Sequence, residues 1–421
     1  MKSARGVAFS VLLNVFENAS YSNIALDKAL RESDLSALDK AFATNIVYGV
    51  LTNLSYLDYQ IKSYSKIPLK KLSEKVKTIL RISLYQMIFM DKVPGSAAVN
   101  EGVKLTKKQA FKSSGFVNAV LRAFIREGKK LPPKDDAVKY LSLLYSYPEW
   151  IVEKWISYFG EDECEKLLEA GNMTPPLTVR VNESKITKEE LKKRLSAEDG
   201  AAESALNLTK RGSVSDMEEF KEGLFTVQDA AAQRAVLTLA PQKGDKVLDM
   251  CAAPGGKTTH IAELIGNEGE VCAWDIYAHK IKLIEDAAKR LSLSNIKAYV
   301  HNGKEPKEEF FGYFDKVLLD APCSGLGIIR RKPDIKWSRK EEDIAEIVKE
   351  QETLLDIAAN YVKRGGCLLY STCTLNKEEN EDMVSEFLKK HADFEMQEKI
   401  LLCPHKDNTD GFFISLMKRE K

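Results

Sequence analysis

The chain has 421 residues, of which 44% are hydrophobic and 30% are charged, and its formal net charge is +1. At about 150 residues per domain this length indicates two or three domains with apolar cores, and the composition excludes a largely disordered or histone-like protein. The charge is uneven, because residues 1–133 hold 21 Lys and Arg against 10 Asp and Glu, whereas the rest hold 42 against 52. The basic part is therefore the candidate for contact with a polyanion.

Residues 1–133 have the apolar spacing of helices. Val7, Val11 and Val15 recur every four residues, which favours an amphipathic helix over a signal peptide. No uncharged apolar run reaches the 18 residues of a membrane span, and the seven cysteines include no Cys-x-x-Cys pair, so neither a disulfide framework nor a zinc site is expected. We expect an all-α domain that ends at Pro132–Pro133, in a cytoplasmic protein.

Residues 134–224 predict a small α/β segment, in which a helical stretch precedes an alternating strand at Leu177–Val181. From residue 225 to residue 421, short apolar runs that end in polar residues alternate with helical patterns. These runs are Val247–Asp249, Val271–Asp275, Ala298–Asn302, Val317–Asp320 and Cys367–Ser371. The alternation is typical of a doubly wound, mainly parallel α/β sheet, which binds its ligands at the carboxyl ends of the strands.

The loop after the first of these strands reads LDMCAAPGGKTTH over residues 248–260. Its glycines allow backbone N–H groups to approach a ligand, and the following helix start supplies further donors. A phosphate-binding loop would match Gly256, Lys257 and Thr258 but would need a glycine where Cys251 stands. A nucleotide hydrolase therefore remains as a rival interpretation.

A site for S-adenosylmethionine explains the same loop better. The methionine part of that molecule needs a carboxylate and backbone donors, which Asp249 and the loop at 252–257 supply. The ribose needs an acidic acceptor at the end of the second strand, where Asp275 stands. Asp275 alone could be a helix N-cap, but the two aspartates on successive strands together favour the cofactor.

Cys323 and Cys373 each follow a buried strand, on the edge where the loop would hold its ligand. A lone cysteine is usually a core filler, but two at this edge indicate chemistry. Carbon 5 of cytosine becomes nucleophilic enough to accept a methyl group once a thiolate has added to carbon 6. Asn376 and Glu379 resemble a capping box, and the helix start they predict would favour a thiolate at Cys373.

Two charged residues fit a cytosine substrate. Asp320 can hydrogen-bond the amino group and ring nitrogen of the base. Lys257 either neutralises charge that develops there or forms a salt bridge. A basic cluster with a tryptophan, at Arg330–Lys332 and Trp337, fits RNA contact, although a solvated loop with a core tryptophan is the alternative.

Five motifs carry a resemblance to a known family: CAAPGGKT at 251–258, DAPCSG at 320–325, RRKPDIKW at 330–337, STCT at 371–374 and DGFF at 410–413. Over essentially its whole length the chain resembles the RNA cytosine carbon-5 methyltransferases of the Nol1/Nop2/Sun family, and among them those of bacterial small-subunit rRNA. The resemblance implies a NusB-like RNA-binding domain (1–133), an intermediate segment (134–224) and a Rossmann-like methyltransferase domain (225–421). The implied substrate is 16S rRNA, free or partly assembled, and we expect a monomer with no metal and no membrane contact.

The resemblance also implies roles for single residues. Cys373 would be the nucleophile and Cys323 would assist release of the methylated base, with Asp320 and Lys257 beside them. The cofactor would be lined by Asp249, Ala252, Ala253, Pro254, Gly255, Gly256, Lys257, Thr258, Asp275, Asn302 and Asp320. RNA would be bound by Arg330, Arg331, Lys332 and Trp337. Asn302 replaces the usual aspartate beside the adenine, but its carbonyl oxygen still accepts a hydrogen bond.

A third interpretation remains open from the residues alone. The basic N-terminal region, with lysines such as Lys66, Lys70 and Lys71, can grip phosphates without reading sequence. That property alone would also suit a non-catalytic RNA-binding scaffold.

Overall fold

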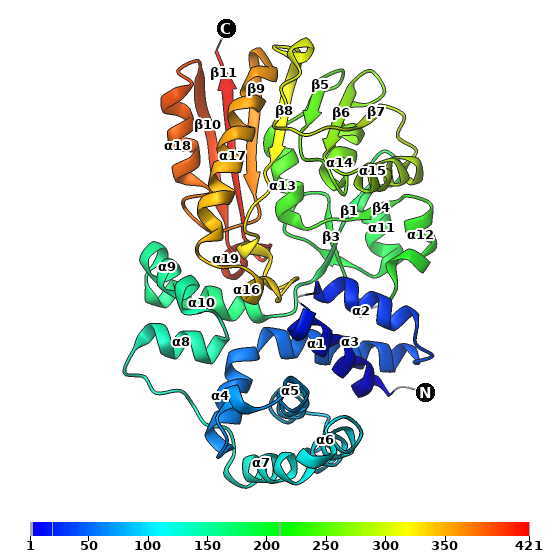
Figure 1. The fold of residues 1–421 in the computed structure, drawn as a ribbon. Coiled ribbons are helices and arrows are strands. Elements are labelled where there is room, and N and C mark those ends of the chain that lie inside the picture. The colour runs from blue at the N-terminus through cyan, green and yellow to red at the C-terminus, as the bar shows by residue number, and fades with distance from the viewer. Residues whose placement is uncertain (1–2, 19, 210–211, 421) are drawn as a thin grey trace. The chain divides into compact units, whose positions relative to one another are not determined.

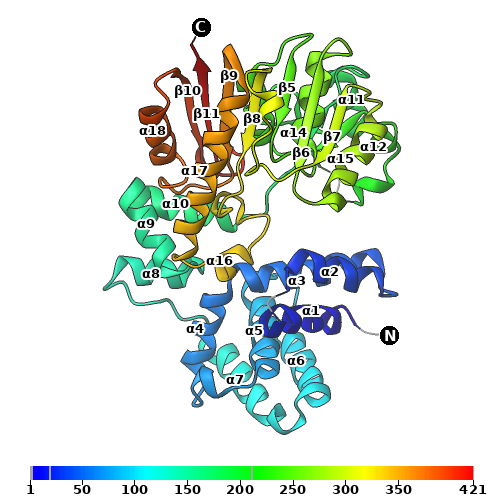
Figure 2. The same ribbon diagram turned by 45° about the horizontal axis from the view of Figure 1, so that its top comes forward.

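The computed structural model describes residues 3–18, 20–209 and 212–420, and the chain divides into two compact units (Figures 1 and 2). Unit 1 comprises Met1–Met173 together with Ile329–Arg339, and unit 2 comprises Thr174–Ile328 together with Lys340–Lys421. The segment Ile329–Arg339, which interrupts unit 2 in the sequence, thus belongs to unit 1.

Unit 1 is helical, as the apolar spacing predicts. Its longer helices are α1 (Ala4–Asn18), α2 (Ser22–Arg31), α3 (Ala37–Thr52), α4 (Leu54–Tyr64), α5 (Glu74–Phe89), α6 (Gly95–Gln109), α7 (Ser114–Glu127), α8 (Ala137–Tyr145), α9 (Glu149–Phe159) and α10 (Glu161–Asn172), and the short α16 (Ile335–Ser338) joins them. Serine side chains at Ser36 and Ser73 accept hydrogen bonds from the first turns of α3 and α5 and fix where these helices start. Leu12, Ile46 and Leu80 lie fully buried in the core they share.

The break at Pro132–Pro133 is not the edge of this unit. Tyr56 N of α4 donates to Ser146 Oγ just after α8 (2.9 Å), and Gln60 Nε2 donates to Lys130 O (2.7 Å). Prolines stop a helix, but they do not determine whether the next helix packs on the same core. The compact unit therefore includes residues 134–173, and the domain boundary expected at residue 133 stays a prediction.

A small antiparallel sheet opens unit 2, with strand order β2-β3-β1-β4. Its elements are β1 (Leu177–Val181), α11 (Lys188–Leu195), β2 (Glu198–Asp199), β3 (Ala205–Leu208), α12 (Glu218–Lys221) and β4 (Phe225–Val227). Val179, Leu206 and Phe225 are buried in its core. The boundary expected between residues 224 and 225 falls just before β4, which pairs with β1 and belongs to this sheet.

The large sheet has seven strands in the order β10-β11-β9-β8-β5-β6-β7. Its strands are β5 (Lys246–Asp249), β6 (Glu270–Asp275), β7 (Ile296–Val300), β8 (Phe314–Asp320), β9 (Val362–Thr372), β10 (Phe394–Leu402) and β11 (Phe412–Arg419). The five predicted strands, β5 to β9, are parallel to one another, and β11 pairs antiparallel with both β9 and β10. The predicted α/β fold is confirmed, and the hairpin β10–β11 extends it.

Helices cover both faces of the large sheet (Figures 1 and 2). Side chains of α13 (Ala230–Leu239), α14 (Gly256–Ile265) and α15 (Ala278–Leu291) pack on one face, and those of α17 (Asp343–Tyr361) and α18 (Glu381–Lys390) pack on the other. The parallel strands β5, β6, β8 and β9 bring their carboxyl ends to one edge. Within the described residues, no helix is both long and apolar enough to cross a membrane.

Candidate active site

The turn after β5 is tightly packed. Ala252 N donates to Trp274 O (2.8 Å) and Gly255 N donates to Ala252 O (2.8 Å), so the chain reverses before α14 begins at Gly256. Gly255 has a φ of +101°, and a Cβ there would lie 3.2 Å from Ile284 Cα. Only glycine combines this conformation with so close an approach. Gly255 therefore serves the packing of the loop against α15.

Two adjoining cavities lie at the carboxyl ends of the strands, with volumes of about 240 and 170 Å³. They share Cys251, Ala253 and Asp320. The larger is also lined by Met250, Asp275, Lys280, His301, Asn302 and Glu350, and the smaller by Gln228, Asp249, Ala252, Pro254, Gly256 and Lys257. Most of the residues predicted for the cofactor therefore line one or the other of these two adjoining cavities, whereas Gly255 and Thr258 line neither of them.

Asp249 lines the smaller cavity and is buried, with 1% of its surface exposed. Its Oδ2 accepts a hydrogen bond from Thr258 Oγ1 (2.7 Å), whereas its Oδ1 has no partner among the described residues. Burial raises the pKa of Asp249 to about 7, against which the Thr258 hydrogen bond acts. An unpartnered, desolvated carboxylate oxygen fits a cationic group such as the ammonium of S-adenosylmethionine.

Asp275 ends β6 and faces the larger cavity. Its carboxylate accepts hydrogen bonds from Ala253 N and Tyr277 N (both 3.3 Å) and lies 3.4 Å from Lys280 Nζ. Asn302 lines the same cavity, and its Oδ1 accepts a hydrogen bond from Lys304 N (3.2 Å). Asp275 and Asn302 therefore line the same cavity, and their contact with the ribose and the adenine of the cofactor stays a prediction.

Asp320 ends β8 and lines both cavities. Its Oδ2 pairs with Lys257 Nζ (2.6 Å), and its Oδ1 accepts a hydrogen bond from Ser371 Oγ (2.8 Å). Burial alone would lower the pKa of Lys257, but the nearby charge of Asp320 outweighs it and raises that pKa above its ordinary value. The salt bridge considered from the sequence is thus present, and it places a charged lysine beside Asp320.

The two cysteines predicted at this edge lie side by side. Cys323 follows β8 and Cys373 follows β9, and their sulfur atoms are 3.2 Å apart, within hydrogen-bond distance. Both are free thiols and partly exposed. The hydrogen bond to Cys373, together with burial, raises the pKa of Cys323 well above its ordinary value. Cys323 is therefore held in its protonated form.

The capping box expected at Asn376 and Glu379 is wrong. Helix α18 begins only at Glu381, and residues 374–380 form an irregular loop. The Glu379 side chain instead accepts hydrogen bonds from Ser324 N (2.8 Å) and Ser324 Oγ (2.5 Å). A capping-box pattern does not reveal such a partner, because that partner lies on another strand's loop. No helix N-terminus therefore begins at Asn376 to favour a thiolate at Cys373.

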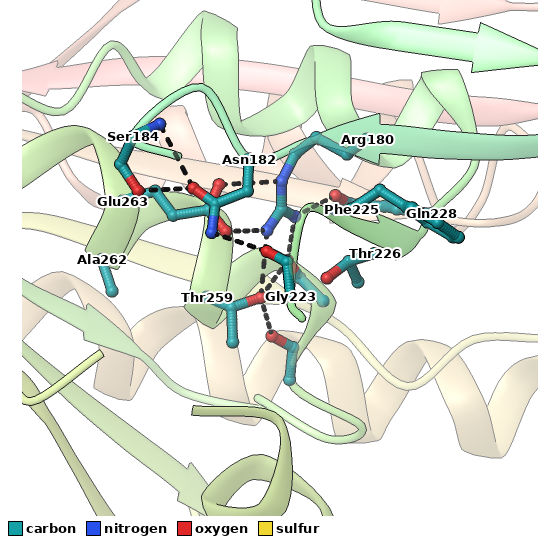
Figure 3. A network of polar contacts seen from close by, with 12 residues as sticks. Arg180, Asn182, Ser184, Gly223, Phe225, Thr226, Gln228, Thr259, Ala262 and Glu263 are labelled. Atoms are coloured by element: carbon teal, nitrogen blue, oxygen red, sulfur yellow. Dashed lines mark hydrogen bonds and ion pairs between the residues drawn. The ribbon is translucent and has the colours of Figure 1, made fainter. Parts of the chain in front are cut away.

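An arginine from the small sheet supports the cofactor loop (Figure 3). Arg180 of β1 is buried, with 1% of its surface exposed, and forms an ion pair with Glu263 of α14 (2.8 Å). It also donates to Gly256 O (2.8 Å), to Thr259 Oγ1 (3.2 Å) and to Gln228 Oε1. Arg180 thus fixes the first turn of α14, which carries Lys257. The sequence offers no signal for this role, since Arg180 is a single arginine in a short strand.

The segment that contains RRKPDIKW lies in unit 1. Trp337 Nε1 donates to Leu51 O (2.8 Å), so the indole predicted to stack on RNA is partly buried against α3. Arg330 and Arg331 are partly buried, and Lys332 is exposed. Their contact with RNA stays a prediction.

Lys336 anchors the same segment. It is fully buried and donates to Asn172 Oδ1 (2.6 Å) and to Thr52 O and Ser146 O (both 3.1 Å), and its Nζ lies 3.7 Å from the centre of the Tyr147 ring. Burial holds the pKa of Lys336 well below its ordinary value. This motif therefore has a packing role that the sequence does not reveal.

Comparisons with known proteins agree with this geometry. Residues 236–418 match the family described as 16S rRNA methyltransferase RsmB/F, residues 2–126 match the NusB family, and residues 147–215 match the ferredoxin-like domain of RsmF/B-like methyltransferases. The chain is 37% identical to a probable ribosomal RNA small subunit methyltransferase B of Bacillus subtilis strain 168, over 99% of both chains. It is 35% identical to the ribosomal RNA small subunit methyltransferase B of Escherichia coli O1:K1 / APEC, over 98% of this chain and 97% of the other.

Solved structures show the same architecture. The crystal structure of the protein PH0851 aligns with a TM-score of 0.82 over 99% of both chains, at 27% identity. NSun6 from Pyrococcus horikoshii, solved with SFG, aligns with a TM-score of 0.58 at 25% identity, over 66% of this chain and 100% of the other. The first of these similarities covers the helical unit, the small sheet and the large sheet alike.

Proposed function

Because the chain belongs to the RsmB/F family of 16S rRNA methyltransferases, we propose that it methylates carbon 5 of a cytidine in 16S rRNA through a covalent bond between Cys373 and carbon 6 of the base. The methyl donor is S-adenosylmethionine, and SFG, with which the similar NSun6 was solved, is an analogue of it. The observation that carries the proposal is the pair of thiols 3.2 Å apart beside the Lys257–Asp320 ion pair.

The donor, when bound, supplies a methyl group on a positively charged sulfur. Asp249 Oδ1 and the backbone N–H groups at the start of α14 hold its amino-acid part, because the carboxylate oxygen lacks a partner and the helix start supplies donors. Asp275 and Asn302 hold its nucleoside part from the larger cavity.

Cys373 acts as the nucleophile, the role that the resemblance of the STCT motif implies, and the hydrogen bond to Cys373 together with burial raises the pKa of Cys323, which favours its protonated form. After its proton has passed to water, the Cys373 thiolate adds to carbon 6, and the electron pair displaced from the ring bonds carbon 5 to the methyl group as the bond between that group and the donor sulfur breaks. Asp320 accepts a hydrogen bond from the amino group of the base, and Lys257 compensates the negative charge that accumulates there.

Release reverses the addition. Water takes up the hydrogen on carbon 5 as a proton, the bonding electrons of that hydrogen restore the ring double bond, and the bond between Cys373 and carbon 6 breaks. Cys323 lies within hydrogen-bond distance of the departing sulfur and stabilises it as a thiolate. Removal of either cysteine should therefore stop the cycle at a different step.

The test uses the full chain, labelled S-adenosylmethionine and 16S rRNA. Cys373→Ala should lose both methyl transfer and any covalent protein–RNA adduct, whereas Cys323→Ala should accumulate the adduct on a denaturing gel. Reversed phenotypes would reverse the assigned roles. A wild-type protein that binds RNA but transfers no label would be the non-catalytic scaffold considered from the sequence. Bisulfite sequencing of rRNA from cells with and without the gene would then identify the cytidine.

A further inference from the structure

Glu379 is a fully buried carboxylate between the loops that carry the two cysteines. Its Oε2 accepts hydrogen bonds from Ser324 N (2.8 Å) and Gln351 Nε2 (3.1 Å). Its Oε1 accepts hydrogen bonds from Ser324 Oγ (2.5 Å) and Asn376 Nδ2 (2.9 Å). The side chain is thus fully engaged by donors from three separate segments.

These contacts reach the residues next to both thiols. Ser324 follows Cys323, and Thr374 follows Cys373. The hydroxyl oxygens of Ser324 and Thr374 are 2.7 Å apart, and Thr374 Oγ1 also lies 3.3 Å from Glu379 Oε1. One carboxylate therefore connects the backbones that set the positions of the two sulfur atoms.

The loop before Cys323 is tied to the same group. Gln351 of α17 uses its Nε2 to donate to Pro322 O (2.9 Å) as well as to Glu379. Among the described residues Glu379 has no ion-pair partner, so its desolvation is offset by hydrogen bonds alone. A buried carboxyl group that lost these donors would be costly, so the donors fix where the Glu379 side chain lies.

We propose that Glu379 is a positioning residue that holds the Cys323 and Cys373 loops in register, so that the two sulfur atoms meet at the base. The inference rests on the proposed roles of the cysteines. Because one carboxylate binds both loops, loss of its charge or of its acceptors should separate the thiols without reaching the cofactor cavity.

Electrostatics reinforces the geometric role. Four titratable groups interact with Cys323: Cys373, Glu379, Asp320 and Tyr370. The charges of Glu379 and Asp320 add to the effects of the Cys373 hydrogen bond and of burial, and all of them raise the pKa of Cys323. Glu379 thus also helps to keep Cys323 protonated while Cys373 attacks.

The test compares Glu379→Gln with Glu378→Gln in the full chain. Glu378 is the preceding residue, is partly exposed and lines the groove between α17 and α18. The probe is 16S rRNA transcribed with 5-fluorocytidine, which traps the adduct because fluorine cannot leave as a proton. Glu379→Gln should slow adduct formation about 100-fold, the effect of displacing a reacting atom by about 1 Å. Its affinity for S-adenosylmethionine should stay at the wild-type value.

A second readout separates positioning from mere folding. Alkylation of Cys323 by iodoacetamide at pH 10, followed by mass spectrometry, should be faster in Glu379→Gln than in wild type. The rate of alkylation in Glu378→Gln should equal that of wild type. A wild-type rate of adduct formation in Glu379→Gln, or an unchanged rate of Cys323 alkylation, would overturn the inference.

Two further variants guard against loss of folding. Ser324→Ala and Thr374→Val each remove one hydroxyl near the carboxylate without removing the buried charge, and each should slow adduct formation about tenfold. Wild-type rates in both would also overturn the inference. If wild-type protein itself forms no adduct with the fluorinated RNA, the proposed function fails instead, and the two failures are thereby distinguished.

Discussion

The loop at 251–258 and the segment at 330–337 each contain proline and a lysine that is largely buried. The two lysines have different partners. Lys257 pairs with a carboxylate at the edge of the sheet and lines a cavity. Lys336 is buried among carbonyl oxygens and an aromatic ring within unit 1. The partner of a buried lysine, rather than the motif that contains it, therefore shows whether it serves binding or packing.

Asp320→Asn tests the role of the Lys257–Asp320 pair in the site, and we expect it to have the largest effect on the rate of methyl transfer. The substitution keeps the shape of the side chain but removes the negative charge that pairs with Lys257. It also replaces one of the two oxygens that can accept a hydrogen bond from the base. The single-turnover rate of methyl transfer should fall about 1000-fold, as for the loss of a catalytic acid–base or charged group. The melting temperature should also fall, because Lys257 would keep a largely buried charge without its partner, so the rate is compared per folded molecule.

Asp315→Asn is the matched control on the same strand. Asp315 lies at the amino end of β8, where it accepts a hydrogen bond from Lys246 N (2.8 Å) and pairs with Lys363. Its loss should cost stability and leave the rate of methyl transfer intact. Equal losses of rate in both variants would show that the charge balance of β8, and not the site, governs activity.

Lys336→Met tests the packing role of the buried lysine in the 330–337 segment. Methionine fills a similar volume, but Thr52 O, Ser146 O and Asn172 Oδ1 would lose their donor. Unpartnered buried acceptors cost about 1–3 kcal/mol, so thermal melting of the full chain should begin at a lower temperature. Lys332→Met, on the exposed part of the same segment, should melt as wild type does. A Lys336→Met protein as stable as wild type would remove the packing role.

Local pattern predicted most of the fold. Strands β5 to β9 appear in the sequence as short apolar runs that each end in a polar residue, because a parallel strand buried on both faces needs such a run. The positions of Asp249, Asp275 and Asp320 could be predicted from these runs, because each residue ends a strand and parallel strands bring their carboxyl ends to one edge. These predictions depend only on neighbours in the sequence and on the rule for α/β sheets.

Long-range partners were the part that the sequence could not supply. Glu379 looked like a capping residue, although its acceptors serve Ser324, 55 residues away in the chain. Ser146, just after α8, accepts a hydrogen bond from Tyr56 N of α4, 90 residues earlier in the chain. Trp337 donates its N–H to Leu51 O, 286 residues away. Such partners cannot be inferred from a local pattern, whereas the domain boundary at residue 133 and the contact of Trp337 with RNA stay predictions.

The cofactor half of the site should show a pH dependence of its own. The pKa of Asp249, raised to about 7 by burial, lies above the ordinary value of about 3.9. A cationic ligand favours the ionised form, so S-adenosylmethionine should bind about tenfold more tightly at pH 7.5 than at pH 6. Calorimetric titration in buffers of different ionisation enthalpy should also detect a proton released on binding.

Asp249→Asn provides the control for that titration. It should bind S-adenosylmethionine more weakly, with an affinity that no longer changes between pH 6 and pH 7.5. In the free protein, the contribution of Asp249 to stability is fully present below its unfolded pKa of about 3.9 and is lost as pH rises through 7. The melting temperature of wild type should therefore fall relative to that of Asp249→Asn over this range, and parallel melting curves would contradict the raised pKa.

The smallest expected effect concerns the exposed part of the 330–337 segment. If Lys332 contacts a phosphate of the RNA, Lys332→Gln should weaken binding of 16S rRNA about threefold and reduce the slope of log K against log salt by about 0.7. Lys349→Gln, an exposed lysine on α17, serves as the control for a general loss of charge. Equal slopes for the two variants would mean that the segment contributes to RNA binding only through its net charge. A lower slope for Lys332→Gln alone would show that Lys332 contacts the RNA. Packing by Lys336 and RNA binding by Lys332 would then be separate functions of two lysines four positions apart.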